Sequence, residues 1–182
     1  KGYIFKGWFT DPEFKNEYKN STITLPADES EKVIPLYAKW ASDQVSYTVK
    51  HYLQQTDGSY KLYEDGAVLN EPGSQKKIGW TDHMTEAQKY SIFGYTAQPF
   101  EQKRIAGDGS TVVNIYYDRA NITITWDMND GGEPIKVIYR YGEMFDAFPA
   151  PSREGYTFKG WYYHNGADKL EAGGKYPVPS AN

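Results

Sequence analysis

The chain has 182 residues, a length that suits one domain or two to three small ones. Hydrophobic residues make up only 39% while 17 Tyr, 8 Phe and 5 Trp bring aromatics to 16%, so a core must rest on rings more than on Leu and Ile. A net charge of -4 without a basic block argues against nucleic acid as a partner, and the absence of Cys excludes disulfides, thiolate catalysis and zinc–cysteine sites.

A heptapeptide is the first predicted element. GYIFKGW stands at Gly2–Trp8 and returns as GYTFKGW at Gly155–Trp161. Glycine at both ends of the aromatic cluster allows a sharp turn, so we expect the rings to pack inward from a pleated segment. The predicted structural core motif comprises Gly2, Tyr3, Phe5, Gly7, Trp8, Gly155, Tyr156, Phe158, Gly160 and Trp161.

The N-terminal piece is expected to close with a strand around Val33–Trp40, and Ala41–Gln44 is interpreted as a linker. In Val45–Leu53 alternation predicts a strand with one inward face, made of Val45, Tyr47, Val49, His51 and Leu53. Thr111–Tyr117 alternates likewise, and we expect these two strands to be neighbours in one sheet.

One segment is predicted to be helical. Thr81–Tyr90 begins with capping residues and continues with Glu86, Ala87, Gln88 and Lys89, which favour helices. Beyond it, Ile122–Trp126 and Ile135–Tyr139 are again strand-like, and the fold class is therefore mainly β, or α+β, with one short helix.

The two flanking pieces are interpreted as complementary fractions of one repeat, with a separate module between them. We expect residues 1–41 to be the C-terminal half of a repeat, 45–119 a β module, and 122–182 a repeat that lacks its last strand. Because an open sheet edge recruits other strands, head-to-tail self-association of the chain is a further expectation.

No catalytic constellation is found, so the chain is not expected to be an enzyme or to carry a cofactor. His51, His83 and His164 have no metal-ligand spacing. The run DMNDGG at Asp127–Gly132 hints at a calcium loop, but its twelfth position is Ile138, so a hairpin turn explains it better. No apolar run is long enough to span a membrane.

The two heptapeptides and the strand Leu36–Trp40 resemble the internalin-type B-repeat, also called the Listeria–Bacteroides repeat. Where that family has Asn-Gly-Gly, this chain has Asn129–Gly132, one residue longer. The middle piece, with YTVKHYLQQTDGSY and IAGDGSTVVNIYYDR, is similar to mucin-binding-protein-like modules. These resemblances imply small β-grasp-like modules in tandem on a Gram-positive cell surface, and the lack of Cys fits an exported protein.

Two functions remain open from the sequence. The first is an extracellular stalk or adhesin segment of the cell wall that contacts neighbouring repeats and a host or cell-surface protein or glycan. The second is a carbohydrate-binding module that uses exposed rings, for which the candidate ligand-binding residues are Trp161, Tyr162, Tyr163 and His164. A stalk buries its rings, whereas a glycan-binding module exposes them beside hydrogen-bonding groups.

Overall fold

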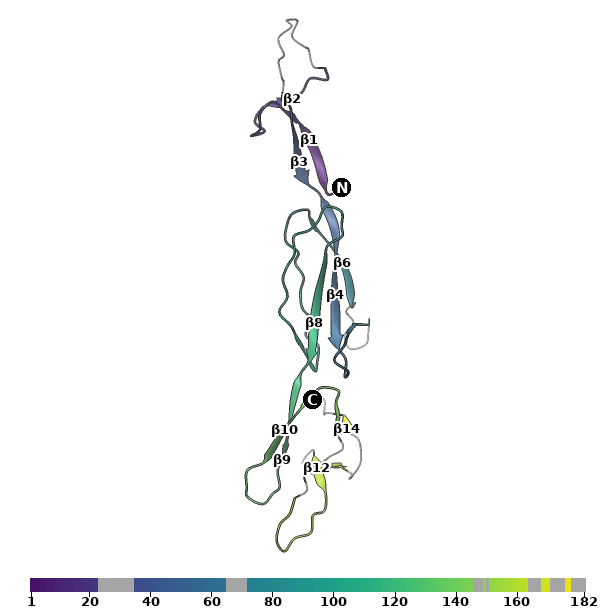
Figure 1. Cartoon of the computed structure of the whole chain (residues 1–182), viewed down its shortest axis with the longest axis vertical. Coiled ribbons are helices and arrows are strands. Elements are labelled where there is room, and N and C mark those ends of the chain that lie inside the picture. The colour runs from purple at the N-terminus through teal and green to yellow at the C-terminus, as the bar shows by residue number, and fades with distance from the viewer. Residues whose placement is uncertain are drawn as a thin grey trace. The chain divides into compact units, whose positions relative to one another are not determined.

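A computed structural model describes residues 1–22, 35–64, 72–145, 149, 151–163, 168–170 and 176–177. Across these ranges the chain forms several small β-sheets and contains no helix (Figure 1). By contacts it divides into two compact units, one made of Lys1–Val49, Gln75–Gln88 and Glu101–Val113, the other of Lys50–Ser74, Lys89–Phe100 and Asn114–Asn182. Strands β4 (Gln44–Gln54) and β8 (Val112–Arg119) supply residues to both units.

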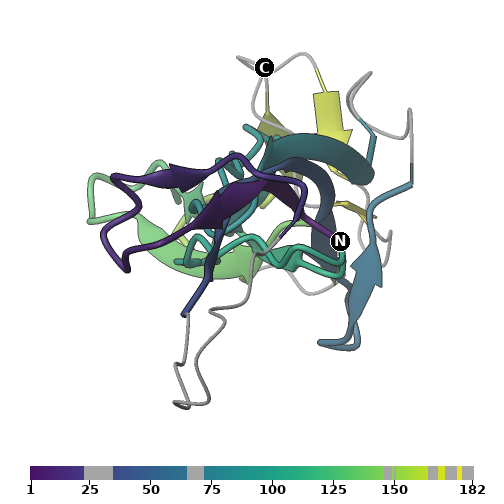
Figure 2. The same ribbon diagram turned by 90° about the horizontal axis from the view of Figure 1, so that it is seen from above.

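The N-terminal sheet, purple to dark blue in Figures 1 and 2, has the order β2-β1-β3. Its strands are β1 (Tyr3–Phe9), β2 (Glu17–Tyr18) and β3 (Tyr37–Ser42), all antiparallel to their neighbours. The expected closing strand thus begins at Tyr37 and pairs with the motif itself; residues 33–34 lie outside the described ranges. A bulge between Phe5 and Gly7, where Gly7 has φ +124°, resets the face of Trp8.

The central sheet has the order β5-β4-β8-β7, with β6 also paired to β4. Its strands are β4 (Gln44–Gln54), β5 (Tyr60–Leu62), β6 (Ser74–Trp80), β7 (Tyr95–Ala97) and β8 (Val112–Arg119). The predicted adjacency of the two long strands is confirmed. Their alternation is confirmed in the middle of the strands, where the inward residues Tyr47, Val49, His51, Val113, Ile115 and Tyr117 are buried. Val45 and Leu53, at the ends of the predicted inward face, are half-buried.

The predicted helix at Thr81–Tyr90 is wrong. This segment is irregular, and its backbone groups bond to residues far away in the sequence instead of to the next helical turn. The Thr85 amide donates to the carbonyl of Lys103 at 2.8 Å, and the Tyr90 amide donates to the Tyr117 hydroxyl at 2.7 Å. Thr81, Thr85 and Ala87 are buried as a result. Tertiary hydrogen bonds and burial outweigh the weak helical propensity of this segment.

Within its described residues, the C-terminal piece forms three two-stranded sheets. The hairpin of β9 (Asn121–Trp126) and β10 (Ile135–Arg140) carries the expected alternation, and Trp126 is buried at its end. The other pairs join β11 (Met144–Phe145) to β14 (Tyr176–Pro177) and β12 (Trp161–Tyr163) to β13 (Asp168–Leu170). In the hairpin loop, Asp127 and Asp130 accept backbone amides two residues ahead, which is turn chemistry.

Candidate functional site

The first heptapeptide presents its rings to the outside. Phe5 packs edge to face against both Trp8 and Trp40, with centroid separations of 5.6 and 5.3 Å. These three side chains are 44%, 47% and 58% exposed. On the opposite face, Phe9 is buried against Phe14. The sheet therefore buries Phe9 on one face and exposes the ring cluster on the other.

The second heptapeptide has the same ring pair in a different setting. Phe158 packs edge to face against Trp161 at 5.5 Å, and Trp161 packs against the buried Trp126 at 4.9 Å. The indole nitrogen of Trp161 donates to the carbonyl of Pro149 at 3.1 Å. Trp161 is therefore half-buried in a cluster whose other members are Ile122, Ile124, Val137, Tyr139 and Leu170.

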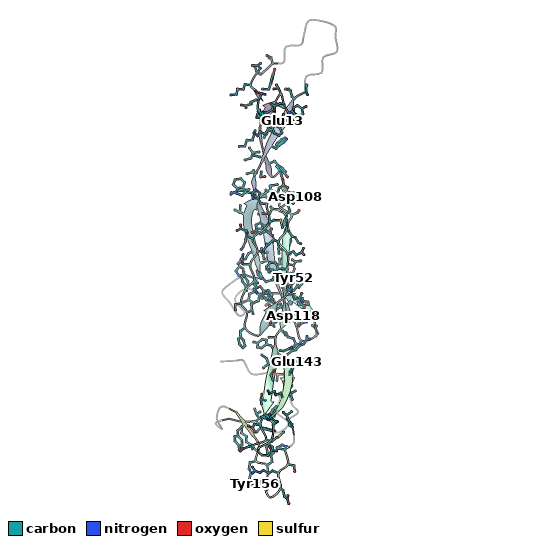
Figure 3. The ribbon with its side chains drawn as sticks, turned by 90° about the vertical axis from the view of Figure 1, so that its left-hand side faces the viewer. Glu13, Tyr52, Asp108, Asp118, Glu143 and Tyr156 are labelled. Atoms are coloured by element: carbon teal, nitrogen blue, oxygen red, sulfur yellow. The ribbon has the colours of Figure 1, made fainter. Side chains whose placement is uncertain are left out.

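The remaining residues of this region differ in exposure. Tyr156 is 68% exposed and has the Arg153 guanidinium 4.2 Å from its ring centroid, and Tyr162 is 52% exposed (Figure 3 labels Tyr156). His164 and the side chain of Tyr163 lie outside the described residues. Of the four candidate ligand-binding residues, the structure thus places Trp161 in a packed cluster and Tyr162 at the surface.

A second aromatic surface, on the outer face of the central sheet, was missed by the sequence reasoning. Tyr52 stacks on Tyr116 with centroids 5.1 Å apart, and Tyr60 meets Tyr116 edge to face. Tyr60 donates to the carboxylate of Asp118, and the side-chain amide of Gln98 donates to both at 2.8 Å (Figure 3). The hydrogen bond to Asp118 raises the pKa of Tyr60. The sequence does carry a signal for this surface, because polar and aromatic residues occupy the outward positions of β4 and β8.

His51 belongs to the core of the central sheet. Its ring is fully buried, stacks on Tyr90 at 3.9 Å, and its Nδ1 lies 2.9 Å from the Tyr117 hydroxyl. Within the described ranges, no three His, Asp or Glu side chains gather closely enough to hold a metal ion. Those same ranges contain no helix of the length and hydrophobicity that a membrane crossing requires.

Two junctions between successive sheets share one hydrogen-bond pattern. The predicted linker Ala41–Gln44 is almost entirely strand, and only Asp43 separates β3 from β4. The Asp43 amide donates to the carbonyl of Gly2, and the Asp43 carbonyl accepts the Thr81 amide, both at 2.9 Å. Gly2 has φ +82°, and a Cβ there would lie 2.2 Å from the Cα of Gly107. Only glycine fits this contact.

The second junction repeats these bonds with other residues. Only Ala120 separates β8 from β9; its amide donates to the carbonyl of Gly94 and its carbonyl accepts the Tyr141 amide, both at 2.8 Å. Gly94 has φ +76°, and a Cβ there would lie 2.3 Å from the ring of Tyr141. The buried guanidinium of Arg119 adds a hydrogen bond to the Tyr141 carbonyl and an ion pair with Glu143 at 3.6 Å.

In both junctions the glycine is followed by a tyrosine that begins a strand, Tyr3 in β1 and Tyr95 in β7. Tyr3 pairs with Ser42 and donates to Asp82 at 2.5 Å, a bond that raises the pKa of Tyr3. Tyr95 pairs with Arg119 and packs edge to face on Tyr141 at 5.5 Å. At each junction the last strand of one sheet is thus joined to a turn of the following piece beside a Gly-Tyr pair of the first sheet.

Comparison with known sequences identifies the flanking pieces. The Listeria-Bacteroides repeat domain matches residues 1–39 and 123–179, together just over half of the chain. The chain belongs to the Listeria–Bacteroides repeat family. This repeat is typical of bacterial surface proteins, and its family is typically non-catalytic. The repeat match includes both heptapeptides and all of the β9–β10 hairpin from residue 123 on, and it leaves the central sheet outside.

Two relatives of this Listeria–Bacteroides repeat chain come from Evansella cellulosilytica. One, described as a Gly-rich membrane protein, is 26% identical over 170 residues, covering 89% of this chain and 18% of its own length. The other, described as a membrane protein, is 25% identical over 173 residues, covering 89% of this chain and 23% of its own length. The chain thus spans about a fifth of the length of these curated relatives. No solved structure matches it.

Proposed function

We propose that this chain is a non-catalytic extracellular segment of a Gram-positive surface protein, in which it acts as a stalk or adhesin module of the cell wall. In this proposal residues 1–41, 45–119 and 122–182 are successive modules that space and present other parts of the protein. Neighbouring repeats are its first partners. The repeat family and the membrane-protein relatives support this assignment.

The observation that carries the proposal is the shared geometry of the two junctions. At each one, a single residue bonds on both of its sides, to Gly2 and Thr81 in one case and to Gly94 and Tyr141 in the other. In a flexible linker between domains, backbone amides of this kind are hydrogen-bonded to water instead. Repeated, sequence-encoded bonds between consecutive sheets are a feature that a spacer requires and that a catalytic or ligand-gated protein does not.

Amide hydrogen exchange on the intact chain tests this. The amides of Asp43 and Ala120 should exchange as slowly as those of the flanking strands, because both are hydrogen-bonded across the junction. Fast exchange at both positions, at the rate of the exposed turn around Gly58, would contradict a spacer built from locked junctions.

A matched pair of glycine variants isolates the second junction. Gly94 and Gly155 both have φ +76°, so alanine strains the backbone equally at each, but a Cβ meets the Tyr141 ring at Gly94 and nothing within 4 Å at Gly155. We expect Gly94→Ala to speed exchange at Ala120 and Tyr141 by on the order of tenfold or more, the loss of roughly one buried hydrogen bond. Gly155→Ala should leave both amides unchanged.

The similarity of the middle piece to mucin-binding-protein-like modules belongs to the same proposal. Its support is the sequence resemblance together with a five-stranded sheet that the repeat match leaves out. A host or cell-surface protein or glycan is the partner that such a module would contact, with no cofactor and no nucleic acid involved.

Carbohydrate binding is the alternative function, and the exposed rings favour it. One of the candidate ligand-binding residues, Tyr162, is exposed; the others are Trp161, Tyr163 and His164. The Tyr52–Tyr116 surface adds two more rings. They lie beside the side-chain amide of Gln98 and the carboxylate of Asp118, groups that hydrogen-bond to sugar hydroxyls. A glycan array of the intact chain decides between the functions.

The array needs two variants and one control. Binding that disappears in Tyr162→Ala assigns the glycan site to the C-terminal piece, and binding that disappears in Tyr52→Ala assigns it to the central sheet. Tyr18→Ala, in the N-terminal sheet, is the control. No bound glycan with the parent chain leaves the spacer function as the better one.

A further inference from the structure

The chain enters the central sheet through one of its two long strands and leaves it through the other. β4 follows β3 after the single residue Asp43, and β8 leads into β9 after the single residue Ala120. Tension that is transmitted along the chain from the flanking pieces therefore reaches the central sheet at the start of β4 and at the end of β8. The pairing of these two strands decides how the sheet responds to that tension.

β4 and β8 are hydrogen-bonded neighbours that run in the same direction. Near the start of both strands, the Thr48 amide donates to the carbonyl of Thr111 at 2.9 Å. Near the end of both strands, the Arg119 amide donates to the side-chain oxygen of Gln54 at 3.2 Å. Because the residue numbers rise together from one contact to the next, the pair is parallel.

A parallel pair that is entered at the start of one strand and left at the end of the other is loaded in shear. Pulling on these two points slides the strands past each other along their length. The hydrogen bonds of a parallel pair are evenly spaced along it, so they carry such a load together. When both strands are pulled from the same end, the bonds break one after another instead.

Side chains on both faces of the pair connect β4 directly to β8. On the buried face, Nδ1 of His51 lies 2.9 Å from the Tyr117 hydroxyl. On the outer face, the rings of Tyr52 and Tyr116 stack with centroids 5.1 Å apart. The strands cannot slide past each other without separating both of these contacts, which adds to the resistance of the backbone bonds.

The residues at which tension enters are themselves held in place. The amide and the carbonyl of Asp43 are both hydrogen-bonded to other segments, and so are those of Ala120. A strand end that is bonded on both sides resists being peeled away from the sheet, so the load passes on to the strand pair.

We propose that the parallel β4–β8 pair is a load-bearing clamp, through which the central module keeps its fold under tension along the chain. In a surface protein, such tension arises when a contacted object is pulled away from the cell. The inference goes beyond the spacer function, because a spacer sets a distance whether or not it resists force.

Single-molecule force spectroscopy of the intact chain tests the clamp. The chain has no Cys, so a pair of introduced cysteines provides unique attachment points. Gln44→Cys/Asn121→Cys places them at the start of β4 and just beyond the end of β8, which loads the pair in shear. Gln44→Cys/Ser110→Cys places them at the starting ends of both strands, which unzips the same pair. All three positions are exposed.

At equal loading rate, the unfolding force should be several-fold higher in the shear geometry than in the unzipping geometry. Tyr117→Phe removes a hydroxyl that joins the two strands, so it should lower the shear force. It should leave the unzipping force unchanged, because unzipping begins at the Thr48 end of the pair. Tyr90→Phe is the matched control: its hydroxyl donates to the carbonyl of Pro72 at 3.0 Å, outside β4 and β8, and the shear force should stay that of the parent.

Equal unfolding forces in the two geometries overturn the clamp, and this comparison stands even if Tyr117→Phe does not fold. A shear force that Tyr117→Phe and Tyr90→Phe lower by the same factor also overturns it, because the force then reports general stability and not the strand pair. Equal forces together with slow exchange at Asp43 and Ala120 would remove the clamp and leave the spacer function in place.

Discussion

At the residue scale, the hydroxyl of Tyr117 joins two groups from other segments of the chain. It accepts the Tyr90 amide at 2.7 Å and lies 2.9 Å from Nδ1 of His51. Burial raises the pKa of Tyr117, so the hydroxyl keeps its proton at neutral pH. This hydroxyl therefore holds β4, β8 and the segment that ends at Tyr90 together.

Tyr117→Phe should destabilise the central sheet by about 2–4 kcal/mol, because it leaves the Tyr90 amide and the His51 nitrogen buried without this partner. Urea unfolding measures the loss. Tyr116→Phe is the matched control: it lies on the other face of β8, and its hydroxyl makes no hydrogen bond with the described residues. Equal losses in the two variants would show that the network contributes nothing beyond ring packing.

The two motif tryptophans should respond differently to truncation. Trp161→Ala empties a site packed on Trp126, and we expect it to lower the stability of the C-terminal repeat by about 2–4 kcal/mol. Trp8→Ala removes a side chain that is 47% exposed and should cost less than about 1 kcal/mol in the monomer. Chemical denaturation monitored by backbone amide signals of each repeat measures both, and the reverse order would contradict the burial described here.

At the scale of elements, two Asp-Gly-Ser turns are built alike. Asp57 accepts both the amide and the hydroxyl of Ser59, and Asp108 accepts the Ser110 amide at 2.9 Å. The hydrogen bonds from the serine hydroxyl and amide hold the pKa of each carboxylate below its ordinary value. Ionised Asp therefore stabilises these turns.

The sign of the pH dependence follows from the lowered pKa values. The stabilisation that ionised Asp57 gives to its turn is complete above the unfolded pKa of about 3.9. It is lost as the pH falls through the lower folded pKa of Asp57. The Ser59 amide resonance should shift over that range in the parent chain. In Asp57→Asn, whose side-chain oxygen accepts at any pH, the shift should vanish. Its persistence would assign the titration to another group.

The elements also show what sequence reasoning can and cannot supply. Alternation in β4 and β8 identified both strands and their buried faces, because period-two patterning and burial have the same cause. The segment from Thr81 has the composition of a helix, but its partners, Lys103 and Tyr117, lie far along the chain. Local propensity does not encode such contacts.

Burial of the motif rings was equally beyond the sequence. Trp8 and Trp161 occupy the same position of nearly the same heptapeptide, yet one is exposed and the other is packed on Trp126. The difference comes from the β9–β10 hairpin and not from the motif. The tyrosine surface of the central sheet could not be predicted for a related reason, since Tyr52, Tyr60 and Tyr116 meet only when three strands are aligned.

For the whole molecule, buried residues are unevenly distributed. Most of the buried apolar residues belong to the central sheet and the segments that cover it, whereas Phe9 and Trp126 are the ones found in the flanking pieces among the described residues. Small sheets with few buried contacts open at lower free energy than a larger packed sheet.

Native-state exchange should therefore rank the sheets. We expect the amides of β4 and β8 to be the last to exchange, and those of β1 and β9–β10 to exchange through earlier openings that leave the central sheet intact. A denaturant series resolves these steps by mass spectrometry of peptic fragments. One common opening free energy for all strands would mean that the chain unfolds as a single cooperative unit.

The single-residue junctions have a consequence for digestion. A protease needs an exposed, extended segment several residues long, and loop tips normally supply it. Asp43 and Ala120 are half-buried and bonded on both sides, so the places where a tandem protein is usually cut offer no such segment here. Nicking should fall instead inside the central module, at the exposed turn around Thr56–Ser59. A protease therefore cuts a surface protein built this way at its loop tips before it separates one module from the next.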